Sequence, residues 1–133
     1  MLLVDTNVII DALEDDPKWY EWSVGQMRHH SNVHELVINP VIYAELAPTQ
    51  ESAQMLDSSL EIMKVSFQEI PRQALFLAGV AHRHYRQAGG PRESILADFL
   101  IGAHAAVLGC GILTRDARRY RKYFPLVPLV TPA

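Results

Sequence analysis

Near its start the chain reads Leu2-Leu3-Val4-Asp5-Thr6-Asn7-Val8-Ile9-Ile10, where one short apolar run ends at a carboxylate and a second begins. The three residues before Asp5 are typical of a buried strand. Thr6 to Leu13 has the pattern of a helix that Asp5 or Thr6 can cap. Continuous apolar strands alternating with helices are typical of a parallel sheet covered on both faces. This stretch therefore predicts an α/β fold.

The same alternation continues to the end of the chain. Further strands are predicted at 36–38, 112–114 and 126–130, and helices at 16–30, 40–47, 51–63, 71–87, 95–108 and 117–123. Asp16-Pro17 and Asn39-Pro40 each combine a cap with a proline at the first helical position. Residues 65–70 fit a strand or a loop, and Pro128 favours an edge strand. Without a repeat or a linker, residues 1–133 are expected to form a single domain.

The composition limits the class of protein. A hydrophobic content of 49% and a formal net charge of −3 fit a soluble globular chain. The apolar runs, such as Ala105 to Cys110, are far shorter than the roughly 20 residues of a membrane span. Cys110 is the single cysteine, which excludes an internal disulfide and a cysteine-rich zinc site. Met1 to Asp5 is typical of a first strand and not of a signal peptide, so a cytoplasmic setting is expected.

Four carboxylates interrupt apolar segments: Asp5, Glu45, Asp98 and Asp116. In parallel sheets, ligands bind beyond the carboxyl ends of the strands. Asp5 and Asp116 follow predicted strands directly, and Glu45 lies in the helix after the second one, where it is expected to face inward. These three acids can therefore converge on one rim of the sheet. Asp98 lies in an apolar helix, on a flank with small residues that would leave room for an ion and a substrate.

A divalent cation removes the repulsion between clustered carboxylates. Oxygen ligands favour Mg²⁺ or Mn²⁺ over Zn²⁺, and such an ion can activate water for attack on a phosphodiester. Each acid alone also has a structural interpretation. Asp5 and Asp116 suit helix caps, Glu45 an exposed helix position, and Asp98 an ion pair with an arginine such as Arg92. Their joint placement favours the metal site.

Polar and basic residues accompany the four acids. Thr6, Asn7 and Thr114 can orient ligands or water, although each is also an ordinary turn or cap residue. The segment Arg115 to Lys122 carries five cations against one acid. Two interpretations stay open for it, a phosphate-binding patch or a solvated helix face. On the first, Arg115, Arg118 and Arg119 would contact RNA.

Four short motifs resemble those of PIN-domain ribonucleases, in the same order. They are Leu3-Val4-Asp5-Thr6-Asn7-Val8, Ala44-Glu45-Leu46, Asp98 to Ala105, and Leu113-Thr114-Arg115-Asp116. Their spacing and the chain length are similar to those of VapC-type toxins of toxin–antitoxin pairs. The sequence differs from the family pattern at two places. At Phe99 to Gly102 the family more often has small residues, and at Asn39-Pro40 it more often has Ser or Thr.

The resemblance implies a fold and an activity. The fold is a three-layer α/β/α sandwich around a mostly parallel sheet, and the activity is RNA cleavage dependent on Mg²⁺ or Mn²⁺. By position, Asp5, Glu45, Asp98 and Asp116 would be the catalytic, metal-binding acids. Thr114 matches a hydroxyl position of the family. The resemblance also implies a homodimer and a VapB-like antitoxin as partner.

Other functions remain as alternatives. A phosphatase with an aspartyl nucleophile at Asp5 needs a second aspartate two residues on, where this chain has Asn7. A catalytically inactive PIN-like module that binds RNA or a partner would be expected to lack one of the acids. A housekeeping RNA-processing nuclease would keep all four and differ only in its biological role.

Overall fold

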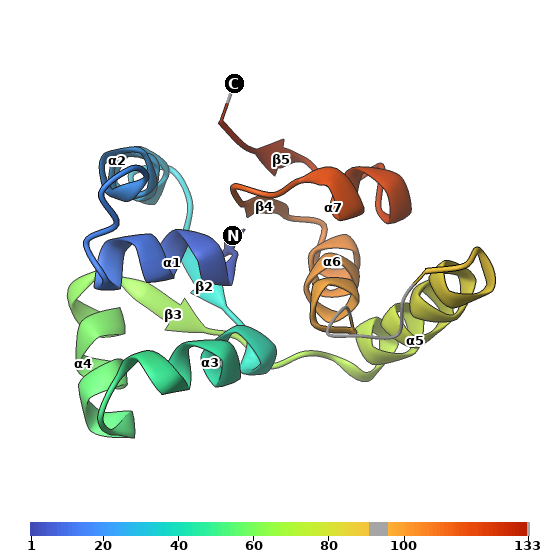
Figure 1. The fold of residues 1–133 in the computed structure, drawn as a ribbon, viewed down its shortest axis with the longest axis horizontal. Helices are drawn as coiled ribbons and strands as arrows, with labels where there is room; N and C mark the ends of the chain where they lie inside the picture. Colours follow the sequence, from blue (N-terminus) through green and yellow to red (C-terminus); the bar gives the residue numbers. More distant parts are fainter. Residues whose placement is uncertain (91–95, 133) are drawn as a thin grey trace.

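The computed structural model describes residues 1–90 and 96–132 (Figure 1). Its strands are β1 (Leu2–Val4), β2 (Leu36–Ile38), β3 (Val65–Phe67), β4 (Gly111–Leu113) and β5 (Leu129–Val130). Its helices are α1 (Thr6–Leu13), α2 (Tyr20–Ser31), α3 (Pro40–Leu46), α4 (Ala53–Ile62), α5 (Arg72–Gln87), α6 (Leu96–Leu108) and α7 (Arg118–Tyr123), with a 3-10 turn η1 (Ala47–Thr49) after α3. Strands and helices alternate, which confirms the predicted α/β class.

The described strands form one parallel sheet in the order β3-β2-β1-β4-β5. In the central strand β1, Leu2 pairs with Leu36 of β2 on one side and with Gly111 of β4 on the other. The chain moves outward from β1 through β2 to β3, and then crosses to β4 and β5. This reversal of direction creates a crevice between β1 and β4 at their carboxyl ends, the usual ligand site of such sheets.

Helices cover both faces of the sheet. Right-handed crossovers place α1 to α4 on one face and α5 to α7 on the other, as Figure 1 shows. The predicted three-layer arrangement is confirmed, and every strand pair is parallel. β5 lies at an edge, as Pro128 predicted. No described helix is both long enough and apolar enough to cross a membrane.

Two element predictions need correction or completion. The helix expected from Asp16 begins only at Tyr20, because Asp16 accepts hydrogen bonds from the backbone N–H groups of Lys18 and Trp19 and forms a turn first. The ambiguous segment 65–70 contains β3, the edge strand beside β2. Ser94, which by residue type could cap the helix predicted at 95–108, lies outside the described residues.

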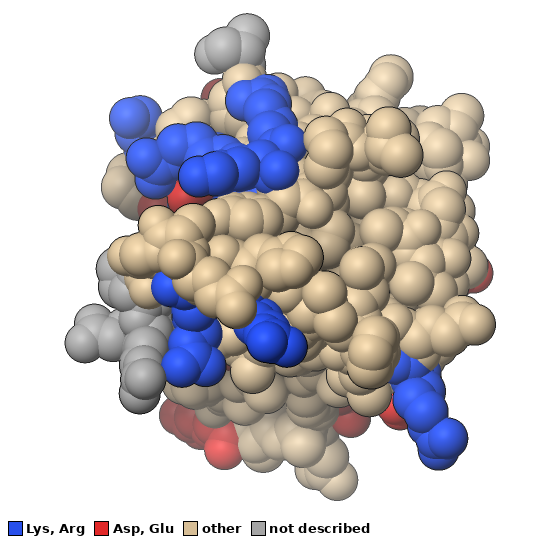
Figure 2. Space-filling view, turned by 90° about the vertical axis from the view of Figure 1, so that its right-hand side faces the viewer, with Lys and Arg blue, Asp and Glu red and all other residues tan. Residues whose placement is uncertain are grey.

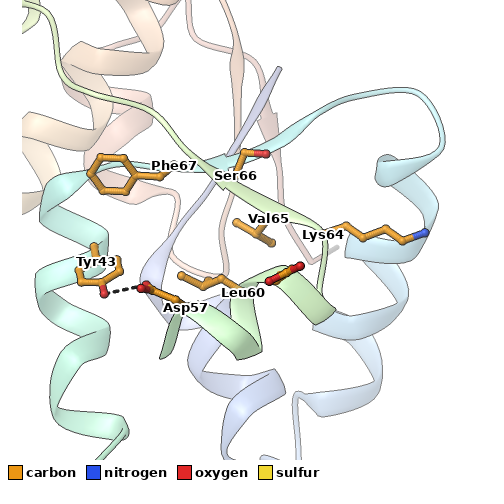
Figure 3. Close-up of a pocket in the computed structure, with 8 residues that line it drawn as sticks. Tyr43, Asp57, Leu60, Lys64, Val65, Ser66 and Phe67 are labelled. Carbon is orange, nitrogen blue, oxygen red and sulfur yellow. Dashed lines mark hydrogen bonds between the residues drawn. The ribbon is translucent and has the colours of Figure 1, made fainter. Parts of the chain in front are cut away.

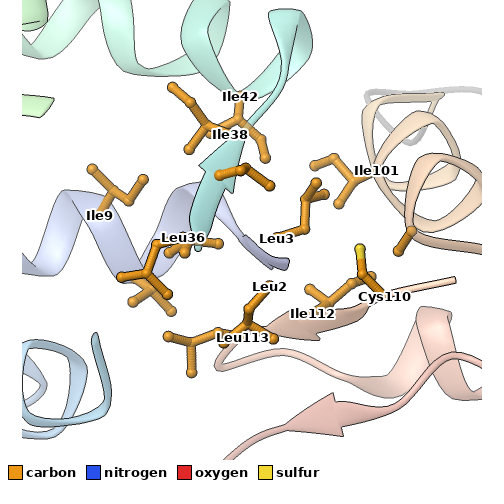
Figure 4. Close-up of a cluster of buried hydrophobic side chains, with 14 of the residues drawn as sticks. Leu2, Leu3, Ile9, Leu36, Ile38, Ile42, Ile101, Cys110, Ile112 and Leu113 are labelled. Atoms are coloured by element: carbon orange, nitrogen blue, oxygen red, sulfur yellow. The ribbon is translucent and has the colours of Figure 1, made fainter. Parts of the chain in front are cut away.

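The apolar core lies between the sheet and its helices. The side chains of β1, β2 and β4 alternate into both layers and meet Ile9, Ile42 and Ile101 from the helices (Figure 4). Burial of these side chains provides most of the free energy of folding. Since β1 is buried on both faces, Asp5 at its end is held in a rigid frame.

A buried polar pair joins the two layers near the acids. Asn39 caps α3, since its Oδ1 accepts from the backbone N–H of Ile42. Its amide nitrogen lies 3.2 Å from Nδ1 of the buried His104 of α6. Because an amide N–H2 only donates, Nδ1 accepts and the imidazole proton is on Nε2. Burial lowers the pKa of His104, so the ring is held neutral. This contact fixes α3 relative to α6, and each of these helices carries one predicted acid.

Candidate active site

All four predicted carboxylates line one pocket at the carboxyl edge of the sheet, where β1 and β4 end. The pocket has a volume of about 550 Å³. Its wall also includes the predicted polar residues Thr6 and Asn7 and the cations Arg118, Arg119 and Lys122. The fold thus brings together four acids that are spread over most of the sequence.

Asp5 is the most buried of the four acids, with 6% of its surface exposed. It caps α1 through a hydrogen bond from the backbone N–H of Thr6 to Oδ1, at 2.8 Å. Its Oδ2 accepts from the hydroxyls of Thr114 at 2.7 Å and Tyr120 at 3.0 Å. Burial raises the pKa of Asp5 to about 6 despite these three donors, and the charge of Asp98 adds to the rise. Within residues 1–90 and 96–132, the groups bonded to Asp5 are all neutral, so no ion pair there stabilises its ionised form.

Asp98 and Asp116 lie nearer the solvent, and each is paired with an arginine of α7. Asp98, with 34% of its side chain exposed, forms an ion pair with Arg119. Partial burial raises the pKa of Asp98, Arg119 opposes this rise, and the charge of Asp116 adds to it. Asp116 is 60% exposed and lies 3.4 Å from Nε of Arg118. An arginine is thus a partner of Asp98, as the structural interpretation expected, and this arginine is Arg119; Arg92, named in that interpretation, lies outside the described residues.

Glu45 is exposed, so the expectation that it faces the interior is wrong. It lies in the last turns of the short helix α3, close to the rim of the pocket. Its Oε1 accepts a hydrogen bond of 2.5 Å from the hydroxyl of Thr6. Of the apolar neighbours that suggested burial, Ile42 is buried and Val41 is only partly buried, so Glu45 lies beyond the border of the buried face of α3. Glu45 nevertheless lines the same pocket as the other three acids.

Thr114 connects Asp5 to Asp116. Its hydroxyl donates to Asp5 and accepts from the backbone N–H of Asp116 at 3.1 Å. The side-chain amide of Asn7 lies 3.4 Å from the same hydroxyl, and its Oδ1 accepts from the backbone N–H of Arg115 at 3.1 Å. The first and last predicted motifs are therefore joined by hydrogen bonds, and the predicted supporting residues hold them in place.

A second aspartate of α1, not predicted as functional, anchors this loop. Asp11 is 1% exposed and accepts two hydrogen bonds from Arg115, at 2.7 Å and 2.9 Å. The hydroxyl of Ser23 in α2 donates to it at 2.6 Å, and the Arg115 guanidinium lies 5.1 Å from the ring centre of Trp19. This buried ion pair, the Asp11–Arg115 clamp, ties the loop after β4 to α1 and α2. The guanidinium of Arg115, expected at the RNA, is engaged inside the protein.

Tyr120 is the other residue that sequence reasoning missed. It is buried within the basic helix α7 and donates its hydroxyl proton to Asp5. Burial and the nearby carboxylates raise its pKa, so the hydroxyl stays protonated and remains a donor. A signal was present, because aromatic residues among the four basic ones of this helix mark the side that packs inward.

The small residues near Asp98 have another role than the expected one. A side-chain carbon at Gly102 would lie 2.3 Å from the ring of Phe124. Gly102 therefore lets Phe124 pack closely against α6, and does not leave space for an ion. The pocket lies instead on the side of Asp98 that faces α7 and α1.

Comparison with known families agrees with this arrangement. A family model of the PIN domain matches residues 2–125. The chain belongs to the PIN domain family. The matched range includes all four acids of the pocket. PIN-domain toxins are generally nucleases, and PIN-domain nucleases generally depend on divalent metal ions. A search of curated proteins finds no match.

Solved structures share the fold of this PIN domain at low identity. VapBC2 from Rickettsia felis, bound to a DNA fragment from their promoter, matches with a TM-score of 0.74 and 18% identity over 99% of this chain and 98% of that chain. VapBC-1 from nontypeable Haemophilus influenzae matches with a TM-score of 0.71 and 19% identity, over 98% of this chain and 96% of that chain. FitAcB from Neisseria gonorrhoeae matches with a TM-score of 0.63 and 19% identity, over 97% of this chain and 96% of that chain. At such identities the likeness concerns the fold.

The pocket of this PIN domain has the donor chemistry of a divalent metal site. Its carboxylate oxygens are the ligands that Mg²⁺ and Mn²⁺ prefer. Within residues 1–90 and 96–132, no three Asp, Glu, His or Cys side chains lie in an arrangement that could hold a metal ion. Asp98 and Glu45 are held instead by Arg119 and Thr6. Burial raises the pKa of Asp5 and of Asp98, and the charge of a neighbouring carboxylate adds to each rise. A bound cation would oppose both causes by stabilising the ionised carboxylates, so the residue types fit one.

The cations of α7 border this pocket of the PIN domain. Arg118, Arg119 and Lys122 line it, and Arg121 lies on the same short helix. Figure 2 shows Lys and Arg side chains gathered at the upper left of the face that α5 and α7 share, with carboxylates directly beside them. Negatively and positively charged side chains thus lie next to each other in one pocket.

A second pocket of the PIN domain has a different character. It has a volume of about 630 Å³ and lies between α3, α4 and the edge strand β3 (Figure 3). There the hydroxyl of Tyr43 donates to Asp57 at 2.8 Å, and Leu60, Val65 and Phe67 provide an apolar wall. None of the four predicted acids lines this pocket. The candidate active site is therefore the smaller, acidic pocket.

Proposed function

We propose that this PIN domain is a metal-dependent endoribonuclease and the toxin of a toxin–antitoxin pair. One observation carries the proposal: all four family acids are present and line one pocket that is also bordered by three cations. Asp5, Glu45, Asp98 and Asp116 would hold Mg²⁺ or Mn²⁺. Such an ion, when bound, supplies activation of water and neutralises charge on a phosphodiester.

The protein side chains have separate tasks in this proposal. Arg118 and Arg119 contact RNA phosphates, and Lys122 takes the place expected for Arg115, whose guanidinium is bonded to Asp11. Asp98 would help to hold a cation by giving up its contact with Arg119, and the guanidinium of Arg119 would then be free to bind a phosphate oxygen. Thr114 and Tyr120 hold Asp5 in one orientation. Thr6 holds Glu45 at the rim.

The partners proposed for the chain follow from the fold and its surface. Several neighbours of similar fold are named as VapBC structures, which supports a VapB-like antitoxin as partner. An apolar face of α5, with Leu75, Phe76 and Val80 exposed, supports a homodimer. We further propose that residues 1–133 act as one domain in the cytoplasm, where the RNA substrate is found.

A cleavage assay tests the catalytic part of this proposal. Purified protein with Mg²⁺ or Mn²⁺ should cut single-stranded RNA, and the Asp98→Asn protein should lose this activity while its melting temperature changes little. Glu61→Gln, an exposed acid in the other pocket, is the matched control and should cleave normally. Full cleavage by the Asp98→Asn protein would contradict the assignment of the site.

A second assay separates a toxin from a housekeeping nuclease. Expression of the chain should arrest growth, and co-expression of the small protein encoded by a neighbouring gene should relieve the arrest and co-purify with the chain. Cleavage without growth arrest would favour the housekeeping role. RNA binding without cleavage in any divalent metal would favour an inactive PIN-like module.

A further inference from the structure

Two tyrosines from distant elements form part of the wall of the acidic pocket. Tyr85 lies near the end of α5 and Tyr123 ends α7, and both line the pocket. Their rings are 5.8 Å apart and meet nearly edge to face. Both side chains are half-buried, so part of each ring faces the pocket. We propose, on the basis of the nuclease function above, that Tyr85 and Tyr123 form a subsite that stacks a base of single-stranded RNA beside the phosphate to be cleaved.

The rings are held in place before any ligand binds. The buried Phe99 packs against Tyr85 at 5.5 Å and against Tyr123 at 5.1 Å between ring centres. The backbone of Gly90 lies against the edge of the Tyr85 ring, where a side-chain carbon would come within 2.3 Å of it. Since the rings are already ordered, a base that stacks on them costs little additional side-chain entropy.

Cations stand beside both rings. The guanidinium carbon of Arg119 lies 5.7 Å from the ring centre of Tyr85, and Nζ of Lys122 lies 5.5 Å from that of Tyr123. Proteins that bind single-stranded nucleic acid combine these two features, with cations for the phosphates and aromatic faces for the bases. A purely structural aromatic cluster needs neither the cations nor the opening toward the acids.

The neighbouring acids favour RNA over other flat ligands. The pocket that contains the rings also contains four carboxylates, which repel a free anionic ligand unless a cation is present. A polynucleotide suits both parts of the pocket. One phosphate would lie at the carboxylates and the cation they hold, and the adjacent base would lie at the tyrosines. Because any base can stack, selectivity at this subsite should be weak. We expect a modest preference for purines, since their larger rings stack over a larger area.

The test measures binding of the cleavage-deficient Asp98→Asn protein to single-stranded RNA that carries 2-aminopurine at one position at a time. Stacking should quench the fluorescence at one or two positions next to the cleaved bond. Tyr85→Leu and Tyr123→Leu should each weaken binding by roughly 5- to 100-fold and remove the quenching. Tyr85→Phe and Tyr123→Phe keep the ring and should stay within about twofold, since stacking needs only the ring face.

Phe67→Leu removes a half-exposed aromatic ring in the other pocket and is the matched control; it should bind as the parent does. A second experiment changes the RNA and leaves the protein unchanged, so it still tests the subsite if the Tyr→Leu proteins unfold. In this experiment the wild-type protein cuts RNA in which one nucleotide at a time is abasic. An abasic nucleotide next to the cleaved bond should raise KM by the same roughly 5- to 100-fold that is expected for the Tyr→Leu variants. Cleavage with no quenching and no abasic effect would overturn the subsite and leave the nuclease intact. Failure of the wild-type protein to cleave or bind RNA would overturn both.

Discussion

The carboxylates around the pocket form two groups that differ in how they are held. The inner acids, Asp5 and Asp11, are buried, and each accepts three hydrogen bonds. The outer acids, Glu45, Asp98 and Asp116, are at least one-third exposed and are each held mainly by one side chain. The inner acids therefore fix the frame of the site. The outer acids can exchange a partner for a cation at small cost, because exposed ion pairs contribute little stability.

The inner acids also differ from each other in charge compensation. Asp11 is bonded to a guanidinium, whereas the three donors to Asp5 are neutral groups. The pKa of Asp5 therefore rises to about 6. Among the described residues, Asp11 is thus paired with a cationic side chain, whereas Asp5 is bonded only to neutral groups.

The largest effect on stability is expected when the Asp11–Arg115 clamp is broken. Asp11→Ala should lower the free energy of unfolding by about 3–5 kcal/mol, because it leaves Arg115 and Ser23 without their partner. Asp116→Ala, which removes an exposed acid of the same loop, should change it by about 0.5 kcal/mol or less. Urea denaturation at pH 7 measures both values. Equal losses in the two variants would remove the distinction between inner and outer acids.

The next effect concerns the charge on Asp5. A pKa raised from its ordinary value of 3.8 to about 6 means that ionised Asp5 destabilises the folded, metal-free protein above pH 6 by about 3 kcal/mol. This destabilisation disappears as the pH falls through 6 toward 4, where the folded protein holds the proton. Relative to wild type, Asp5→Asn should therefore gain stability as the pH rises from 4 to 7.

Unfolding in urea with EDTA between pH 4 and pH 8 measures that difference. Mg²⁺ at pH 7.5 should then stabilise the wild type more than Asp5→Asn. A constant difference between the two proteins across this range would show that Asp5 titrates as an ordinary carboxyl. The Glu61→Gln protein again serves as the control, since its side chain lies outside the acidic pocket.

A smaller effect is expected from one donor to Asp5. Tyr120→Phe removes the hydroxyl that lies 3.0 Å from Oδ2 and keeps the buried ring. It should lower the free energy of unfolding by about 1.5–3 kcal/mol at pH 7, the range for a hydrogen bond to a charged group, and by less at pH 4. Thermal melts at the two pH values measure this. Tyr123→Phe, at a half-buried ring, should melt like the wild type at both.

The smallest effect should appear at the outer acids. Arg119→Ala frees Asp98 from its ion pair, so Mn²⁺ should bind about two- to fivefold more tightly, in line with the roughly 0–1 kcal/mol of a partly exposed pair. Arg118→Ala removes the same charge from a more exposed pair and should change the affinity less. Isothermal titration with Mn²⁺ compares the two variants. Equal affinities would mean that Arg119 does not compete for Asp98.

Much of the fold and the site follows from local patterns in the sequence. The caps Asp5 and Asn39, the first two apolar strands and the edge position of β5 were predicted correctly. The last strand is shorter than predicted, because only Leu129–Val130 of the segment 126–130 pairs with β4. The start of α2 was placed too early, because a turn at Asp16 uses the same cap-and-proline signal as a helix. The exposure of Glu45 was missed because α3 is too short for its apolar neighbours to define a buried face.

The sequence by itself determined which acids follow strands, since strand and helix patterns depend on neighbours a few residues away. Only the tertiary structure decided which charge pairs with which. Asp11 and Arg115 are 104 positions apart in the sequence, and Asp98 of α6 pairs with Arg119 of α7. Such pairings depend on the packing of the whole sheet and its helices. That packing buries Asp5 and Asp11 and leaves Asp98 and Asp116 at the surface, a difference that no local pattern contains.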